Sequence, residues 1–316
     1  MSHRHSYALD STITLDVHGT RQRVRLCGGR RGLPPVLVVQ AGPGLPLLNE
    51  AERFQRGLQL EPDFSVAYWD QRGCGHAAVQ DAQSVSLKTQ VDDVCAIVRW
   101  LADETQQRVV VLGISLGATF ALQAAARDAS RIKGLVAVSI DADTACSDAA
   151  VSSFLREVGM QAGNRRLTRS IEKLGKPPYI TPAPFQLRER LLTNLGGIEQ
   201  GRRFSELLRG LLSSLVRTYG WIGAVTALRN MNEIQRQLLP EVATLNLFAH
   251  WPRPAIPVHY IFGGRDPLVP SSMVQEISGI AANRDTVVTA PNAAHMVHFD
   301  EPAIVRSLVV QAHCRL

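Results

Sequence analysis

Residues 109–126 impose the strongest constraint on how this chain folds. Val109–Leu112 is a short apolar run rich in β-branched residues, which is typical of a buried strand. It leads into Gly113-Ile114-Ser115-Leu116-Gly117, and a stretch of helix-forming composition, Ala118–Ala126, follows. The two glycines leave room where a tight turn presses against its neighbours, so the Ser115 hydroxyl can project from the end of the strand. The pattern predicts a strand, a sharp turn with a nucleophilic serine, and a helix. The alternative is a glycine-rich turn whose serine has no chemical role.

Elsewhere the chain alternates short apolar strands with helical stretches. Thr12–Asp16 and Gln22–Leu26 alternate apolar and polar residues, which predicts an antiparallel hairpin at one edge of a sheet. Apolar residues within Leu87–Ala102 have helical spacing. Further strands are predicted at residues 36–39, 65–69, 135–140, 258–262 and 285–289, with a closing helix at 303–312. Strands that alternate with helices predict an α/β fold, in which helices cover both faces of a mostly parallel central sheet.

The alternation stops between about Ala142 and Trp251, where leucines recur at helical spacing. Residues 161–236 hold 13 Lys and Arg against 5 Asp and Glu, a local balance of +8 compared with +6 for the whole chain. The sequence therefore predicts a helical cap inserted after the sixth strand. It divides the chain into a first core part at 1–141, the cap at 142–252 and a second core part at 253–316. The positive charge is either a solvated helical face or a pocket for an anionic substrate.

A nucleophilic serine needs a general base, an acid that orients the base, and donors that stabilise an oxyanion. Ligands of a parallel sheet gather at the carboxyl ends of its strands, so the partners of Ser115 should follow strands. Asp266 follows the strand at 258–262, and His295 follows the last strand. The order Ser115, Asp266, His295 is the order of the α/β-hydrolase fold. His298 is the rival of His295, and Asp141, after the strand at 135–140, is the rival of Asp266.

Two further motifs carry a resemblance to a known family. Gln40-Ala41-Gly42-Pro43-Gly44 is similar to H-G-G-P-G, and Asp70–Gly75 matches D-Q-R-G-x-G. With the serine turn, they make both core parts resemble an α/β-hydrolase of the proline iminopeptidase-like family. The resemblance implies an oxyanion hole formed by the backbone N–H groups of Gly42 and Leu116. Those peptidases also hold the substrate's ammonium group with cap carboxylates, for which the stretch 161–236 offers Glu172, Glu189, Glu199, Glu206 and Glu233.

The two motifs supply further candidates for lining the pocket or supporting its loops. Gln40 and Ala41 stand where the family has histidine and glycine. Asp70 and Arg72 are expected to form a structural ion pair that braces a loop. Cys74 lies outside the serine turn and is expected to be part of the pocket wall and not a nucleophile.

Composition restricts the partners and the compartment. The five cysteines lie far apart without a C-x-x-C pair, which predicts reduced thiols in a cytoplasmic protein. No apolar run approaches the roughly 20 residues of a membrane helix, and the first ten residues show no signal peptide. No recognised nucleic-acid motif accompanies the arginines. The expected partner is a small-molecule acyl substrate, without nucleic acid, membrane, metal or cofactor, and the sequence leaves the oligomeric state open.

Together these features predict a serine hydrolase that acts on a small ester, lactone or amide through a Ser-His-Asp triad and an acyl-enzyme. Ser115 attacks a carbonyl, His295 transfers the proton, and Asp266 fixes the histidine tautomer. Three alternatives stay open. They are a true proline iminopeptidase, a biosynthetic enzyme that uses the same fold for acyl transfer or cyclisation, and a ligand receptor with slow turnover.

Overall fold

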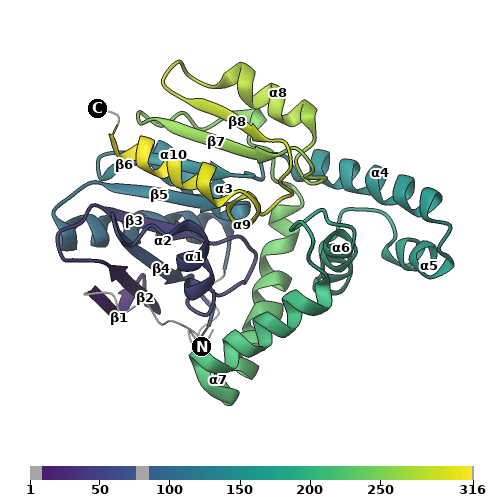
Figure 1. Cartoon of the computed structure of the whole chain (residues 1–316), viewed down its shortest axis with the longest axis horizontal. Coiled ribbons are helices and arrows are strands. Elements are labelled where there is room, and N and C mark those ends of the chain that lie inside the picture. Colours follow the sequence, from purple (N-terminus) through teal and green to yellow (C-terminus); the bar gives the residue numbers. More distant parts are fainter. Residues whose placement is uncertain (1–8, 76–84, 315–316) are drawn as a thin grey trace.

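An eight-stranded sheet forms the centre of the computed structural model, which describes residues 9–75 and 85–314 (Figure 1). The strand order is β1-β2-β4-β3-β5-β6-β7-β8. β1 (Leu9–Val17) and β2 (Thr20–Gly28) form the predicted hairpin at one edge, and β2 pairs antiparallel with β4 (Ser65–Asp70). The remaining pairs are parallel and join β4 to β3 (Pro35–Val39), β5 (Val109–Ile114), β6 (Ile132–Val138), β7 (Val258–Gly263) and β8 (Thr286–Ala290). The mostly parallel sheet that the sequence predicts is confirmed.

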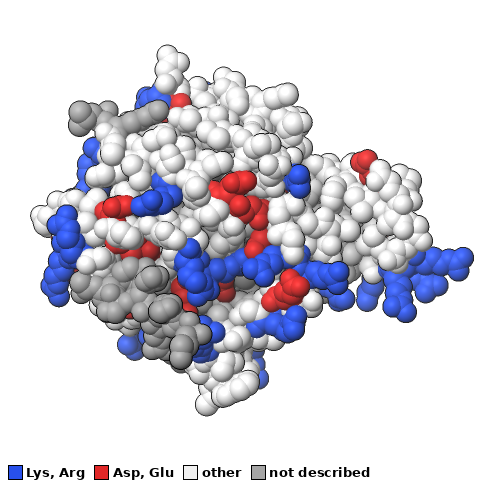
Figure 2. Space-filling view, viewed as in Figure 1, with Lys and Arg blue, Asp and Glu red and all other residues white. Residues whose placement is uncertain are grey.

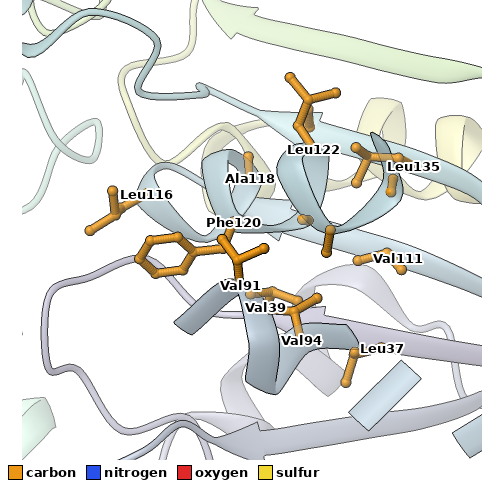
Figure 3. Packing of buried hydrophobic residues seen from close by; sticks show 14 of the residues in the cluster. Leu37, Val39, Val91, Val94, Val111, Leu116, Ala118, Phe120, Leu122 and Leu135 are labelled. Atoms are coloured by element: carbon orange, nitrogen blue, oxygen red, sulfur yellow. The ribbon is translucent and has the colours of Figure 1, made fainter. Parts of the chain in front are cut away.

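Helices cover both faces of this sheet. One face carries α2 (Leu87–Thr105), α3 (Leu116–Arg127) and α8 (Ser271–Ile280), and the other carries α1 (Ala51–Leu58), α9 (Val297–Asp300) and α10 (Pro302–Cys314). Successive residues of a strand face opposite sides. Accordingly, Leu37 and Val39 pack in one apolar cluster, and Val36 and Val38 pack in the other. In Figure 3, Phe120 of α3 lies beside Val91 of α2 in the first cluster.

The strand β6 is displaced along the chain from its predicted position. The sequence predicts a strand at 135–140, whereas β6 spans Ile132–Val138. The strand ends there because Ser139 has a φ of 45°, outside the range of extended backbone. Asp141 therefore lies in the loop after β6, at the same edge of the sheet as Ser115.

Helices fill the chain between β6 and β7. They are α4 (Thr144–Ala162), α5 (Arg165–Leu174), α6 (Pro182–Asn194), α7 (Phe204–Val242) and the short 3₁₀ helix η1 (Phe248–His250). α7 is kinked at Gly220, whose φ of 70° and ψ of 175° are not helical. In Figure 1 these helices extend away from the sheet, and α4 and α5 form the outermost part. This is the stretch for which the sequence predicts a cap, and the division into domains stays a prediction.

None of the helices among the described residues combines the length and the apolar character that crossing a membrane requires.

Candidate functional site

The turn between β5 and α3 holds Ser115 in a strained backbone conformation, with φ of 52° and ψ of −124°. Glycine is required on both sides of the serine. A Cβ on Gly113 would lie 2.6 Å from the Ala118 Cα, and a Cβ on Gly117 would overlap the backbone oxygens of Val39 and Gln40. The strand, turn and helix predicted from the sequence are present, and the turn is packed tightly against the end of β3. Strain of this kind is typical of functional sites.

Three side chains from separate loops meet at this turn. The Ser115 hydroxyl donates to His295 Nε2 at 2.9 Å, and His295 Nδ1 donates to Asp266 Oδ2 at 2.7 Å. Asp266 follows β7 and His295 follows β8, so both lie at the carboxyl ends of parallel strands. The second oxygen of Asp266 accepts the backbone N–H of Leu268 at 2.8 Å, which fixes the carboxylate.

The surroundings of His295 suit proton transfer. Burial acts to lower the pKa of His295, but the Asp266 carboxylate bonded to Nδ1 raises it, and the net shift is upward from the ordinary value. An imidazole held by a carboxylate in this way can accept the serine proton, and the carboxylate stabilises the resulting imidazolium.

The two rival residues have other surroundings. His298 is buried, and its ring stacks on Phe54 with ring centres 5.0 Å apart. Burial and the neighbouring Arg53 hold the pKa of His298 well below its ordinary value. Asp141 meets the Thr144 hydroxyl at 3.4 Å, and burial raises the pKa of Asp141 to about 6. The structure thus places His295 and Asp266, and not their rivals, beside Ser115.

Gly42 and Leu116, the implied oxyanion donors, are neighbours. A Cβ on Gly42 would lie 3.6 Å from the Leu116 Cδ2, and both residues line the cavity that contains Ser115. Leu116 is the first residue of α3, so its N–H has no acceptor within the helix. In the segment that carries Gly42, the N–H of the preceding residue, Ala41, already donates to the Gln40 side chain at 3.0 Å.

The expected ion pair between Asp70 and Arg72 does not form, because the two side chains have different partners. Arg72 donates to both oxygens of Asp93 on α2, at 2.8 and 2.7 Å. Asp70 accepts two backbone N–H groups and a tyrosine hydroxyl. The chain turns directly after β4, so residues two positions apart reach opposite neighbours.

The candidate pocket residues fall into two groups. Gln40 and Ala41 line the cavity. Asp70, Arg72 and Cys74 are buried away from it and belong to the packing behind the loops. Burial raises the pKa of the Cys74 thiol well above its ordinary value, which disfavours a thiolate nucleophile there.

The cavity around Ser115 has a volume of about 620 Å³ and runs between the sheet edge and α4, α6 and α7. Most basic residues of the stretch 161–236 lie outside it, and Figure 2 shows basic side chains of α5 facing solvent at one end of the molecule. In the described residues, the acidic side chains that line the cavity outnumber the basic ones. They are Glu50, Glu52, Asp141, Asp148, Glu189, Glu199 and Glu206, against Arg53, Arg56, Arg188, Arg202 and Arg217.

A buried charge cluster near Ser115 escaped the sequence analysis. Arg188 donates to Asp148 at 2.6 Å and to Glu189 at 3.0 Å, and its guanidinium lies 4.8 Å from the Phe185 ring centre. The charges of Arg188 and His295 both act to lower the pKa of Asp141, so Asp141 lies beside this cluster. The partners are up to 40 positions apart in the sequence, and no local motif marks them.

Comparisons with known proteins agree with this architecture. A model of the alpha/beta hydrolase family matches residues 21–308. The probable aminopeptidase YbaC of Bacillus subtilis (strain 168) is 22% identical over 296 residues, covering 92% of each chain. The crystal structure of proline iminopeptidase from Mycobacterium smegmatis superposes with a TM-score of 0.66 at 16% identity, covering 96% of this chain and 99% of that one. An N-formylmaleamic acid deformylase from Pseudomonas putida S16 gives a TM-score of 0.56 at 18% identity, covering 95% and 100%.

The match of the family model over most of the chain, on a sheet with this order and this serine turn, shows that the protein is a hydrolase and belongs to the alpha/beta hydrolase family, with a resemblance to proline iminopeptidases.

Proposed function

We propose that this protein is a serine hydrolase that cleaves a small ester, lactone or amide through an acyl-enzyme on Ser115. The observation that carries the proposal is the chain of hydrogen bonds from Ser115 to His295 (2.9 Å) and from His295 to Asp266 (2.7 Å) inside the 620 Å³ cavity. The helices α4, α6 and α7 act as the cap that encloses the substrate.

The proposed reaction has two halves. Ser115 Oγ attacks the carbonyl carbon while His295 Nε2 takes the hydroxyl proton, and the N–H groups of Gly42 and Leu116 hold the oxyanion. Collapse of this intermediate breaks the bond to the leaving group, which takes the proton from His295. A water molecule then attacks the acyl-enzyme, gives a proton to His295 and releases the acid, and the proton returns to Ser115.

Labelling by a fluorophosphonate probe and hydrolysis of p-nitrophenyl acetate test this proposal. Ser115→Ala should abolish labelling and lower kcat by roughly 10⁴-fold, as loss of a triad member does. His295→Ala should match it, whereas His298→Ala, three positions away, should retain labelling of Ser115. A folded Ser115→Ala protein with near-normal turnover contradicts the proposal, and a reversed order of the two histidine variants transfers the general base to His298.

A second candidate function is an aminopeptidase. The excess of acidic side chains along the cavity favours it, because a carboxylate is the natural partner of a substrate's free ammonium group. Two proteins with similar chains are named as aminopeptidase and proline iminopeptidase. Of the cap glutamates, Glu206 lines the cavity and Glu233 lies outside it, paired with Arg236 at 2.6 Å. Asp141 also lines the cavity and acts electrostatically on His295, and it is the carboxylate that we propose as the ammonium partner. Cleavage of proline naphthylamide in preference to p-nitrophenyl acetate would select this candidate.

A further inference from the structure

Asp70, the first residue of the D-Q-R-G-C-G motif, is a buried carboxylate whose two oxygens join separate parts of the chain. Oδ1 accepts the backbone N–H groups of Leu47 and Leu48, at 2.7 and 2.9 Å. Oδ2 accepts the hydroxyl of Tyr219 at 2.6 Å. A Cβ on Gly75 would overlap Oδ2, so the turn that follows β4 encloses the carboxylate from the remaining side.

The segments that Asp70 joins both border the cavity. Leu47 and Leu48 lie in the loop between β3 and α1 (residues 40–50), which we call the β3–α1 loop and which carries Gly42. Tyr219 belongs to α7 and directly precedes the kink at Gly220. Asp70 therefore connects the loop with the proposed oxyanion donor to the helix that covers the cavity.

Other contacts hold the same loop against α7. The Asn49 side chain donates to the Ser214 hydroxyl at 2.9 Å. A Cβ on Gly44 would lie 3.0 Å from the backbone oxygen of Met231, so loop and helix backbones approach closely there. The bond between Asp70 and Tyr219 differs from the Asn49–Ser214 bond because both of its partners are buried and because it is shorter, at 2.6 Å compared with 2.9 Å.

We propose that Asp70 and Tyr219 are positioning residues, which hold the β3–α1 loop so that the Gly42 N–H points at the oxyanion and which align that loop with α7. This inference rests on the proposed function. An oxyanion donor contributes only when it is held in place before the reaction, and a displacement of less than 1 Å weakens it. Loss of the link should therefore lower kcat more than it changes KM.

Tyr219→Phe removes the hydroxyl, and with it the bonds to Asp70 Oδ2 and to the Asn49 backbone, and leaves both backbone bonds of Asp70 intact. The chain offers a matched control, because the Tyr68 hydroxyl donates to the buried carboxylate of Glu61 at the same distance of 2.6 Å. Tyr68 and Glu61 do not belong to the described residues that line the cavity. Tyr68→Phe thus deletes a tyrosine–carboxylate hydrogen bond of the same length elsewhere in the fold.

The experiment measures kcat and KM for p-nitrophenyl acetate, the Ki of phenylboronic acid and the Tm of each variant. Phenylboronic acid adds to the serine and places an oxygen where the oxyanion forms. We expect Tyr219→Phe to lower kcat roughly 5- to 20-fold and to raise Ki by a similar factor, a small share of the effect of losing an oxyanion donor. KM should stay within about twofold, and Tyr68→Phe should leave kcat and Ki within about twofold of wild type. Asp70→Asn keeps the shape of the side chain, and we expect it to lower kcat more than Tyr219→Phe does.

Equal kcat and Ki in the two tyrosine variants, with similar losses of Tm, would overturn the inference and leave the bond a purely structural one. A rise of KM alone would also overturn it. The wild-type protein separates this outcome from failure of the proposed function. Without labelling of Ser115 in the wild type, the proposed function and this inference fall together, whereas equal tyrosine variants of an active enzyme contradict the inference alone.

Discussion

At the scale of single residues, Asp141 is the group that distinguishes the two candidate functions. Its carboxyl lines the cavity, and burial raises its pKa to about 6. If it binds a substrate ammonium group, Asp141→Asn should raise KM for proline naphthylamide about 10- to 100-fold, the range of a hydrogen bond to a charged group. KM for p-nitrophenyl acetate, which has no cation, should not change.

The pH dependence of the wild type gives the same test without a mutation. The carboxyl binds a cation only when ionised, so KM for proline naphthylamide should fall as pH rises through about 6. Asp143→Asn is the control, because Asp143 caps α4 outside the cavity lining and asparagine caps a helix as well as aspartate. Equal KM values in Asp141→Asn and Asp143→Asn would remove the ammonium site and favour the first function.

The sequence predicts the meeting of Ser115, Asp266 and His295 because each follows a strand, and carboxyl ends of parallel strands share one edge. It does not predict the partners of Asp70 and Arg72, since a turn of a few residues decides which neighbour each side chain reaches. The cluster around Arg188 is also beyond prediction. In the sequence, Arg188 and Asp148 resemble ordinary charged residues of solvated helices, and only the contact between α4 and α6 buries them.

At the scale of elements, the turn between β5 and α3 depends on Gly117. A Cβ there would overlap the backbone oxygens of Val39 and Gln40, and backbone cannot move aside as a flexible side chain can. Gly117→Ala should therefore lower the free energy of unfolding by about 1–3 kcal/mol, the usual cost of overpacking. It should also lower kcat, because the turn that carries Ser115 shifts away from His295.

Gly279→Ala is the control for this prediction. Gly279 lies in α8, and a Cβ there has open space around it. Alanine at this position should leave stability unchanged or raise it by up to about 1 kcal/mol. Thermal unfolding and p-nitrophenyl acetate hydrolysis compare the two variants. Unchanged stability and kcat in Gly117→Ala would show that the close approach of the turn to the end of β3 is needed neither for folding nor for positioning Ser115.

The strands β3, β4, β5 and β7 are predictable here because their short apolar runs are buried on both faces, and the β1–β2 hairpin is predictable because its apolar and polar residues alternate. The end of β6 is not, since it depends on the positive φ of Ser139. The kink in α7 is equally hidden. It depends on the non-helical backbone of Gly220, for which the sequence around that residue gives no separate signal.

At the scale of the whole molecule, net charge and cavity charge differ. The stretch 161–236 is strongly basic, yet its cavity-lining arginines are matched in number by its cavity-lining glutamates. The basic residues Arg165, Arg166 and Arg169 of α5 are exposed. The sequence allows two interpretations of this charge, a solvated helical face or a pocket for an anionic substrate. The structure favours the solvated helical face.

Replacing Arg165, Arg166 and Arg169 together by glutamine tests that reading. Charges that face solvent are screened beyond about 8 Å at physiological ionic strength. We expect kcat/KM to stay within about twofold for an acyl substrate that bears a carboxylate and for its methyl ester, since exposed charges contribute little. A selective loss for the carboxylate, which added salt reproduces in the wild type, would restore the anionic-substrate hypothesis.

The last helix gives the molecule a feature of practical use. Of the five cysteines, Cys314 at the end of α10 is exposed, Cys27 and Cys74 are buried, and Cys95 and Cys146 are half-buried. Burial raises the pKa of Cys27 to about 12, so that its thiolate is scarce at neutral pH. α10 ends across the sheet from α4 and α5 (Figure 1). A maleimide dye or a solid support can therefore be attached to Cys314, at a distance from the cavity. Enzyme immobilised in this way would leave the side of the molecule that holds the cavity open to the bulk solution.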